Sequence, residues 1–182
     1  MSGVSCATER LPPRDSVVNE RDNRVLSAVM TDLLSYRGED SPVRGPFSLP
    51  EPLVFAREPE RGEVSVADIL YRHEKGPWET LTSDQIRAAA ESALHLAHRA
   101  KATSGEFAFV APDVTVRGAS ESREFYDRVL SAYPPGYSSE QHVAIVRLHI
   151  PWSMWHSVVG TYIVISDGDV WRVLLRQFVY YL

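Results

Sequence analysis

The sequence predicts an α+β fold in which three helices pack on a curved antiparallel sheet that ends in a C-terminal three-strand β-meander. Apolar residues recur at helical spacing in the N-terminal and central parts of the chain, whereas alternating β-branched residues dominate its end. The pair Asp167-Gly168 separates two of these alternating segments, as in a tight hairpin. A length of 182 residues suits one domain.

The N-terminal region divides into an arm and a helix. Residues 1–20 are polar and contain consecutive prolines, so we expect a flexible arm, followed by a single α+β domain over residues 21–182. A first helix is predicted from Asp22 to Tyr36, before Gly38 and Pro42. Its buried stripe consists of Val25, Leu26, Val29, Leu33 and Leu34.

The central region should contain two more helices and several short strands. A second helix is expected from Ser83, as N-cap, to about Lys101, and a third from Ser120 or Ser122 through Val129 and Leu130. Residues 53–56 predict an edge strand, and residues 107–110 and 114–117 predict two short strands.

The last part of the chain carries the clearest strand pattern. Residues 142–150 and 158–166 alternate, and a turn at Asp167-Gly168 leads into a strand over residues 170–181. These three segments form the predicted meander.

Composition limits the class of function. The net charge of −5 opposes nonspecific binding to nucleic acid, and no apolar run is long enough to span a membrane. Cys6 is the single cysteine, so an intramolecular disulfide is excluded and a cytoplasmic location is expected. Phosphate-binding glycine motifs are absent, and we expect no cofactor.

One stretch resembles a known fold family. The segments 161–164 and 170–173, joined by Asp167-Gly168, resemble the closing hairpin of the nuclear transport factor 2-like fold. This resemblance implies a cone-shaped pocket between the helices and the sheet, and no catalytic residue is carried over by it. The same stretch with its flanks, residues 150–153 and 176–181, is also similar to the ends of bacterial proteins of uncharacterised function.

Two patterns could support metal binding or catalysis, and each has an ordinary alternative. Glu91, His95 and His98 lie on one helical face, where they could bind a metal, but such residues are also common on a solvated face. The types of a Ser/His/Asp triad occur around Ser153 and Asp167, although no nucleophile elbow is present. We therefore assign no catalytic and no metal-ligating residue.

The predicted binding residues fall into two groups. Trp152, Trp155 and His156 lie in a strand connection, where exposed aromatic rings favour partner binding. If the strand register allows it, a cationic cluster forms on one sheet face; otherwise this face is simply solvated. The cluster consists of Arg147, His149, Arg172 and Arg176. Arg147→Ala and Arg176→Ala should each weaken binding at least tenfold while changing stability by no more than about 1 kcal/mol.

These patterns favour a non-enzymatic module that binds a protein partner, or an accessory subunit of a larger assembly. The alternative is a small-molecule site in a cone-shaped pocket, with isomerase or hydrolase chemistry. A homo-oligomer is compatible with either hypothesis.

Overall fold

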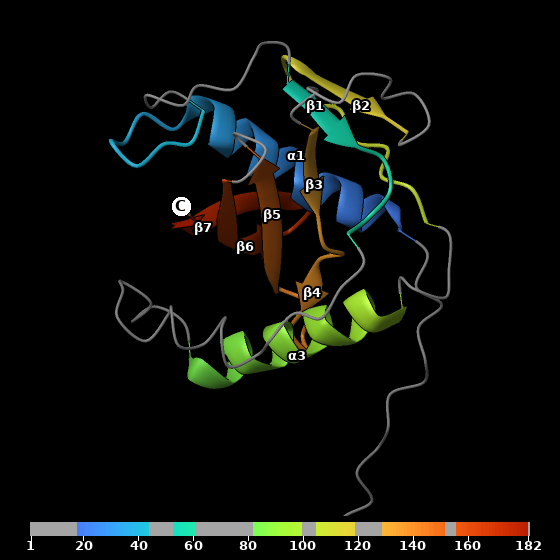
Figure 1. The fold of residues 1–182 in the computed structure, drawn as a ribbon. Coiled ribbons are helices and arrows are strands. Elements are labelled where there is room, and N and C mark those ends of the chain that lie inside the picture. The colour runs from blue at the N-terminus through green and yellow to red at the C-terminus, as the bar shows by residue number, and fades with distance from the viewer. Residues whose placement is uncertain are drawn as a thin grey trace, which may run out of the picture.

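The computed structural model confirms the α+β class and shows, in the part of the chain that it describes, two helices on an open, mixed seven-strand sheet (Figure 1). The strand order is β2 (Val114–Arg117), β1 (Leu53–Ala56), β3 (Val129–Ala132), β5 (Val143–Pro151), β6 (Ser157–Asp167) and β7 (Val170–Tyr181). The short strand β4 (Gly136–Tyr137) pairs with β5 beside this path. The structure describes residues 18–43, 53–60, 82–99, 105–118, 129–151 and 156–181. The predicted arm and the predicted single-domain boundary are not tested by these ranges and stay predictions.

The C-terminal meander is confirmed. It consists of β5 (Val143–Pro151), β6 (Ser157–Asp167) and β7 (Val170–Tyr181), each antiparallel to the next. Gly168 has a φ of 64°, a left-handed conformation that glycine adopts without steric cost, so it suits the hairpin between β6 and β7.

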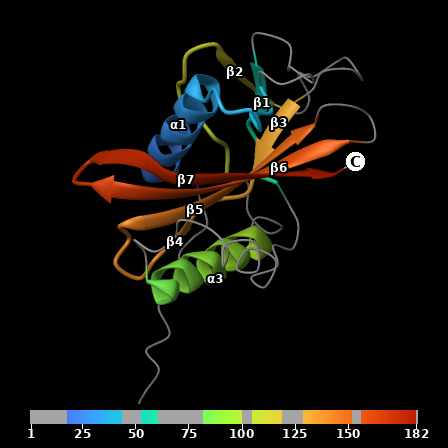
Figure 2. The ribbon, with the colours of Figure 1, turned by 90° about the vertical axis from the view of Figure 1, so that its left-hand side faces the viewer.

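The two described helices cover opposite faces of the sheet (Figure 2). α1 (Glu20–Ser35) begins with a capping box, in which Asn19 and Asp22 each accept a hydrogen bond from the other's backbone N–H. Its apolar stripe packs on Val146, Leu148 and other core residues of one face. α3 (Ser83–Arg99) covers the other face. Its Ile86, Ala89 and Ala90 form a second core cluster with Val143, Ile145 and Ile163.

Parallel pairing at one side of the sheet corrects the prediction of an antiparallel sheet. β1 (Leu53–Ala56) runs parallel to both β2 (Val114–Arg117) and β3 (Val129–Ala132), and lies between them. The prediction of an edge strand at residues 53–56 is therefore wrong. Phe55 is fully buried and packs edge-on against Phe107 and Phe109, so this short strand belongs to the core.

The third predicted helix is wrong where the structure describes it. Val129 and Leu130, assigned to that helix, lie in β3, because pairing with β1 and β5 buries this segment on both edges. Residues 119–128 lie outside the described ranges. Residues 107–110 are not a strand either, whereas the predicted strand over residues 114–117 is confirmed as β2.

A β-bulge near the middle of β7 changes which side chains share a face. Ile163 pairs with Leu175, but the next residue, Val164, pairs with Val173, so Leu174 is the extra residue. Arg172 and Arg176 consequently lie on opposite faces of the sheet. Simple alternation had placed them on one face.

Neither described helix has the length and apolar character needed to cross a bilayer. The cytoplasmic location stays a prediction.

Candidate functional site

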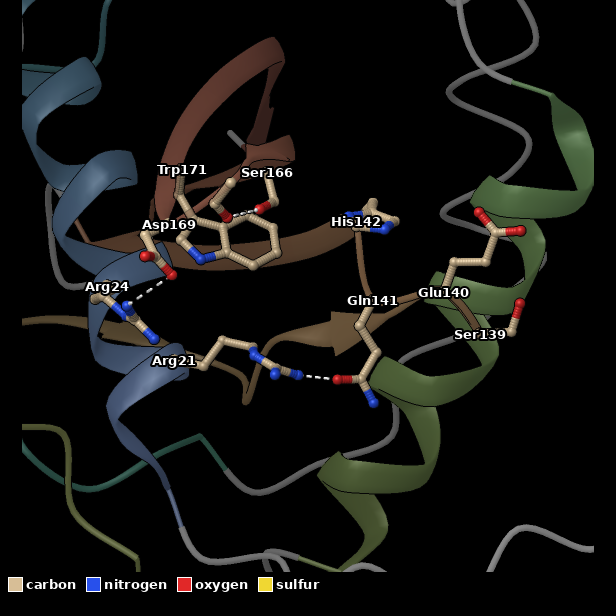
Figure 3. A pocket seen from close by; sticks show the side chains of 10 residues that line it. Arg21, Arg24, Ser139, Glu140, Gln141, His142, Ser166, Asp169 and Trp171 are labelled. Carbon is tan, nitrogen blue, oxygen red and sulfur yellow. Dashed lines mark hydrogen bonds and ion pairs between the residues drawn. The ribbon is translucent and has the colours of Figure 1, made fainter.

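A groove of about 330 Å³ opens at the end of the sheet where the β6–β7 hairpin approaches α1. Three segments meet there: the first turns of α1, the turn before β5, and the hairpin itself (Figure 3). We call this site the hairpin-end groove. Its lining residues are Arg21, Arg24, Ser139, Glu140, Gln141, His142, Ser166, Gly168, Asp169 and Trp171.

Two tight turns shape the groove. Gln141 has a φ of 59°, which is unfavourable for a residue with a Cβ atom, and its N–H donates to the carbonyl of Ser138 at 2.8 Å. In the hairpin, the hydroxyl of Ser166 donates to the carbonyl of Gly168 at 2.6 Å. These bonds fix the backbone on both sides of the groove.

Arg21 is held in place by two groups of the turn region. One of its terminal nitrogens donates to the side-chain oxygen of Gln141, and its guanidinium lies 5.7 Å from the centre of the Tyr137 ring. The Tyr137 hydroxyl in turn donates to the buried carboxylate of Asp22 at 2.6 Å. Arg21 is thus a fixed positive charge at one side of the groove.

Arg24 is held much more loosely. Its nearest carboxylate is that of Asp169, at 3.9 Å, and the two side chains are 47% and 100% exposed. Exposed pairs of this kind contribute little to stability because water and salt screen them. The guanidinium of Arg24 is therefore accessible to another anion.

Trp171 provides the apolar surface of the groove. Its indole is half-buried, packs edge-on against Tyr137 with ring centres 6.0 Å apart, and lies between Arg24 and His142 (Figure 3). The neighbouring Val170 is 67% exposed at the hairpin. That side chain points away from the groove, because Val170 pairs with Asp167 while Trp171 pairs with Ser166. The site therefore combines an anchored aromatic ring and two guanidinium groups.

The structure does not assemble the predicted cationic cluster. Arg147 and His149 lie on the face that α3 partly covers, but Arg172 pairs with Ile165, far along the sheet from them. Arg176 lies on the opposite face, where Asp32 of α1 accepts two of its hydrogen bonds. The bulge at Leu174 moves Arg176 to the face opposite Arg172, whereas the register of the strands separates Arg172 from Arg147 and His149. Binding by any of these residues individually stays a prediction.

The other predicted candidates are only partly described. Trp152, Trp155 and Ser153 lie outside the described residues, whereas His156 is half-buried just before β6. Asp167 lies at the opposite end of β6 from His156, so these two members of the possible triad are not neighbours. In the described ranges, no three His, Cys, Asp or Glu side chains are grouped closely enough to hold a metal ion.

Sequence reasoning missed every residue of the hairpin-end groove except the turn itself. Arg21, Gln141 and Trp171 are far apart in the sequence, and their proximity depends on how α1 packs on the meander. The one local signal was Trp171 close after the Asp167-Gly168 turn, which places an aromatic ring at a hairpin end. The arginines lie on an amphipathic helix and look like ordinary solvated residues.

Comparisons with protein-family models, with curated proteins and with solved structures found no match for this chain. The resemblance to the nuclear transport factor 2-like fold accordingly stays a prediction, and a functional hypothesis has to come from the geometry of the groove.

Proposed function

We propose that this protein is a non-enzymatic binding module, such as an accessory subunit, that recognises a protein partner through the hairpin-end groove. The observation that carries the proposal is the position of Trp171 beside the accessible guanidinium of Arg24. Tryptophan and arginine are the side chains that most often dominate the energy of protein interfaces.

The character of the groove favours a protein partner over an enclosed small molecule. Small-molecule sites are mostly apolar and bury most of their ligand, whereas this groove is lined by charged and polar groups and opens to solvent. Between α1 and the sheet, where the alternative hypothesis requires a cone-shaped pocket, Met30 and Tyr162 are fully buried in a core cluster. These observations support the module over an isomerase or hydrolase.

The test is retention of a partner by wild-type and variant protein. Immobilised wild type should retain a stoichiometric protein from an extract of the cells that produce it. Trp171→Ala should lose that protein while circular dichroism shows that the variant keeps the fold. Arg87→Asp is the control, because Arg87 is an exposed arginine on α3, on the opposite face of the sheet. A partner retained equally by all three proteins would contradict the proposed surface.

A further inference from the structure

We infer that the hairpin-end groove binds a carboxylate of an acidic segment in the partner protein at Arg24, and that Asp169 occupies this position until the partner displaces it. This inference rests on the proposed function and specifies its chemistry. Its basis is the difference in distance and exposure between two ion pairs of this protein, Arg24 with Asp169 and Arg176 with Asp32.

The pair formed by Arg24 and Asp169 has the geometry of a replaceable contact. The 3.9 Å separation exceeds that of a charge-assisted hydrogen bond, and Asp169 is fully exposed at the hairpin. By contrast, Arg176 and Asp32 lie 2.5 Å apart and are only 29% and 18% exposed. The fold therefore forms a tight pair where α1 meets β7, and a loose pair where the groove opens.

The surroundings of Arg24 favour one carboxylate once Asp169 moves away. Arg21 lies one helical turn before Arg24 and keeps its charge beside the groove, held by Gln141 and Tyr137. A carboxylate of the partner could accept two parallel hydrogen bonds from Arg24, which an aspartate at 3.9 Å does not do. The Trp171 ring beside it would receive an apolar side chain adjacent in the partner's sequence.

The same surroundings argue against a polyanion as the ligand. Glu140 and Asp169 also line the groove, and the whole chain carries a net charge of −5. A nucleic acid would meet these carboxylates along its backbone, and the overall field would repel it. A single acidic side chain within a mixed peptide segment avoids both penalties.

The inference predicts opposite effects for the two members of the pair. Removal of the internal competitor by Asp169→Asn should strengthen carboxylate binding, whereas Arg24→Gln should abolish it. Arg24→Lys keeps the charge without the bidentate geometry and should bind with intermediate affinity. If the ion pair only stabilised the fold, the two substitutions would not change the binding affinity in opposite directions.

A titration followed by nuclear magnetic resonance tests this prediction. The probe is N-acetyl-Glu-Leu-amide, with N-acetyl-Gln-Leu-amide as the neutral control, and the signals are the Arg24 side-chain N–H and the Trp171 indole N–H. We expect saturable shifts with the glutamate peptide and an affinity about tenfold lower for the glutamine peptide. Asp169→Asn should raise the affinity for the glutamate peptide roughly threefold, because the competing carboxylate is gone.

The pair on α3 supplies matched control variants. Arg87 and Asp84 are 54% and 88% exposed with 3.4 Å between them, so Arg87→Gln and Asp84→Asn should leave the titration unchanged. Absence of saturable shifts with the glutamate peptide, equal binding of both peptides, or weaker binding by Asp169→Asn would each overturn the inference. Because both groove residues are exposed, amide spectra should show that these variants keep the fold.

Partner retention separates the failure of this inference from the failure of the proposed function. If Trp171→Ala loses the partner while Arg24→Gln and Asp169→Asn retain it as wild type does, the module stands and the carboxylate site is wrong. If all three variants retain the partner as wild type does, both proposals fail.

Discussion

Arg176 of β7 donates two hydrogen bonds to the carboxylate of Asp32 in α1, from Nε at 2.6 Å and from Nη2 at 2.5 Å. Its guanidinium also lies 4.4 Å from the centre of the Tyr36 ring, just after the end of α1. The hydrogen bonds to Asp32 raise the pKa of Arg176 further, so it stays charged under all ordinary conditions. This contact links β7, the outermost strand of the meander, to α1, the helix that covers it.

Loss of either partner should therefore destabilise the fold. We expect Arg176→Ala and Asp32→Ala each to lower the free energy of unfolding by about 1.5 to 3 kcal/mol, as for hydrogen bonds to charged groups. The double variant should lose clearly less than the sum, since the two residues act together. Urea denaturation of the four proteins measures this coupling. Losses below about 0.5 kcal/mol, which are typical of surface substitutions, would restore the sequence-based expectation that Arg176 is a binding residue without a structural role.

Tyr162 should show a different response, because its fully buried hydroxyl has no hydrogen-bond partner among the described groups. Tyr162→Phe removes this hydroxyl and should leave stability at neutral pH unchanged or raise it by up to about 1 kcal/mol. Tyr137→Phe is the matched control, since that hydroxyl donates to Asp22. Its removal should cost about 1.5 to 3 kcal/mol. Equal losses for the two variants, measured by urea denaturation, would show that Tyr162 has a partner.

Alkaline pH gives a second test of the same tyrosine. Burial, and then the negative charge of Asp32, raises the pKa of Tyr162 well above its usual value near 10. The unfolded chain thus releases this proton near pH 10 while the folded chain keeps it, so stability is full below pH 10 and falls above it. Tyr162→Phe should reduce this loss by as much as about 1.4 kcal/mol per pH unit. Part of the loss should remain, because Tyr36, Tyr133 and Tyr180 also have raised pKa values. An identical decline in both proteins would contradict the assignment.

Local patterns were sufficient for the parts of the fold that depend on local forces. α1 and α3 followed from apolar residues at helical spacing, and the meander followed from alternation and the Asp167-Gly168 turn. The N-cap of α3 was predicted one residue too late. It is Thr82 and not Ser83, because the Thr82 carbonyl accepts hydrogen bonds from the first backbone N–H groups of the helix.

The remainder depends on contacts between distant segments. The parallel pairing of β1 with β2 and β3 joins residues far apart in the sequence, and no local pattern specifies it. No local pattern in the sequence indicates the bulge at Leu174 either, although this bulge places Arg172 and Arg176 on opposite faces of the sheet. Because the hairpin-end groove forms only when α1 packs on this sheet, its residues could not be predicted as a site.

Gly136 marks a close approach of α3 to the sheet. A Cβ atom at this position of β4 (Gly136–Tyr137) would lie 2.2 Å from the carbonyl oxygen of Ala89 and 2.3 Å from the backbone nitrogen of Ala93. The backbone of α3 would have to move, so Gly136→Ala should destabilise the protein by about 2 kcal/mol or more. Gly168→Ala is the control, because a Cβ there meets open space and only the positive φ opposes it, at about 1 to 2 kcal/mol. Thermal unfolding of both variants ranks them, and a smaller effect at Gly136 would show that α3 does not pack closely on β4.

Deletion of residues 176–182 should abolish folding rather than trim a tail. The deletion removes half of β7, including the partners of residues 157–162 in β6, and so leaves the edge of β6 unpaired. It also removes the bond from Arg176 to Asp32 and the edge-on contact between Phe178 and Tyr162. The bond from the Tyr180 hydroxyl to the carbonyl of Asp40 is lost as well.

Val179→Thr is the matched control for this deletion, because it keeps the backbone pairing and a β-branched side chain in the same strand. Circular dichroism and size-exclusion chromatography should show an unfolded or aggregated truncated chain beside a folded control, whereas a truncated protein that melts as wild type does would contradict the role of β7 in the sheet.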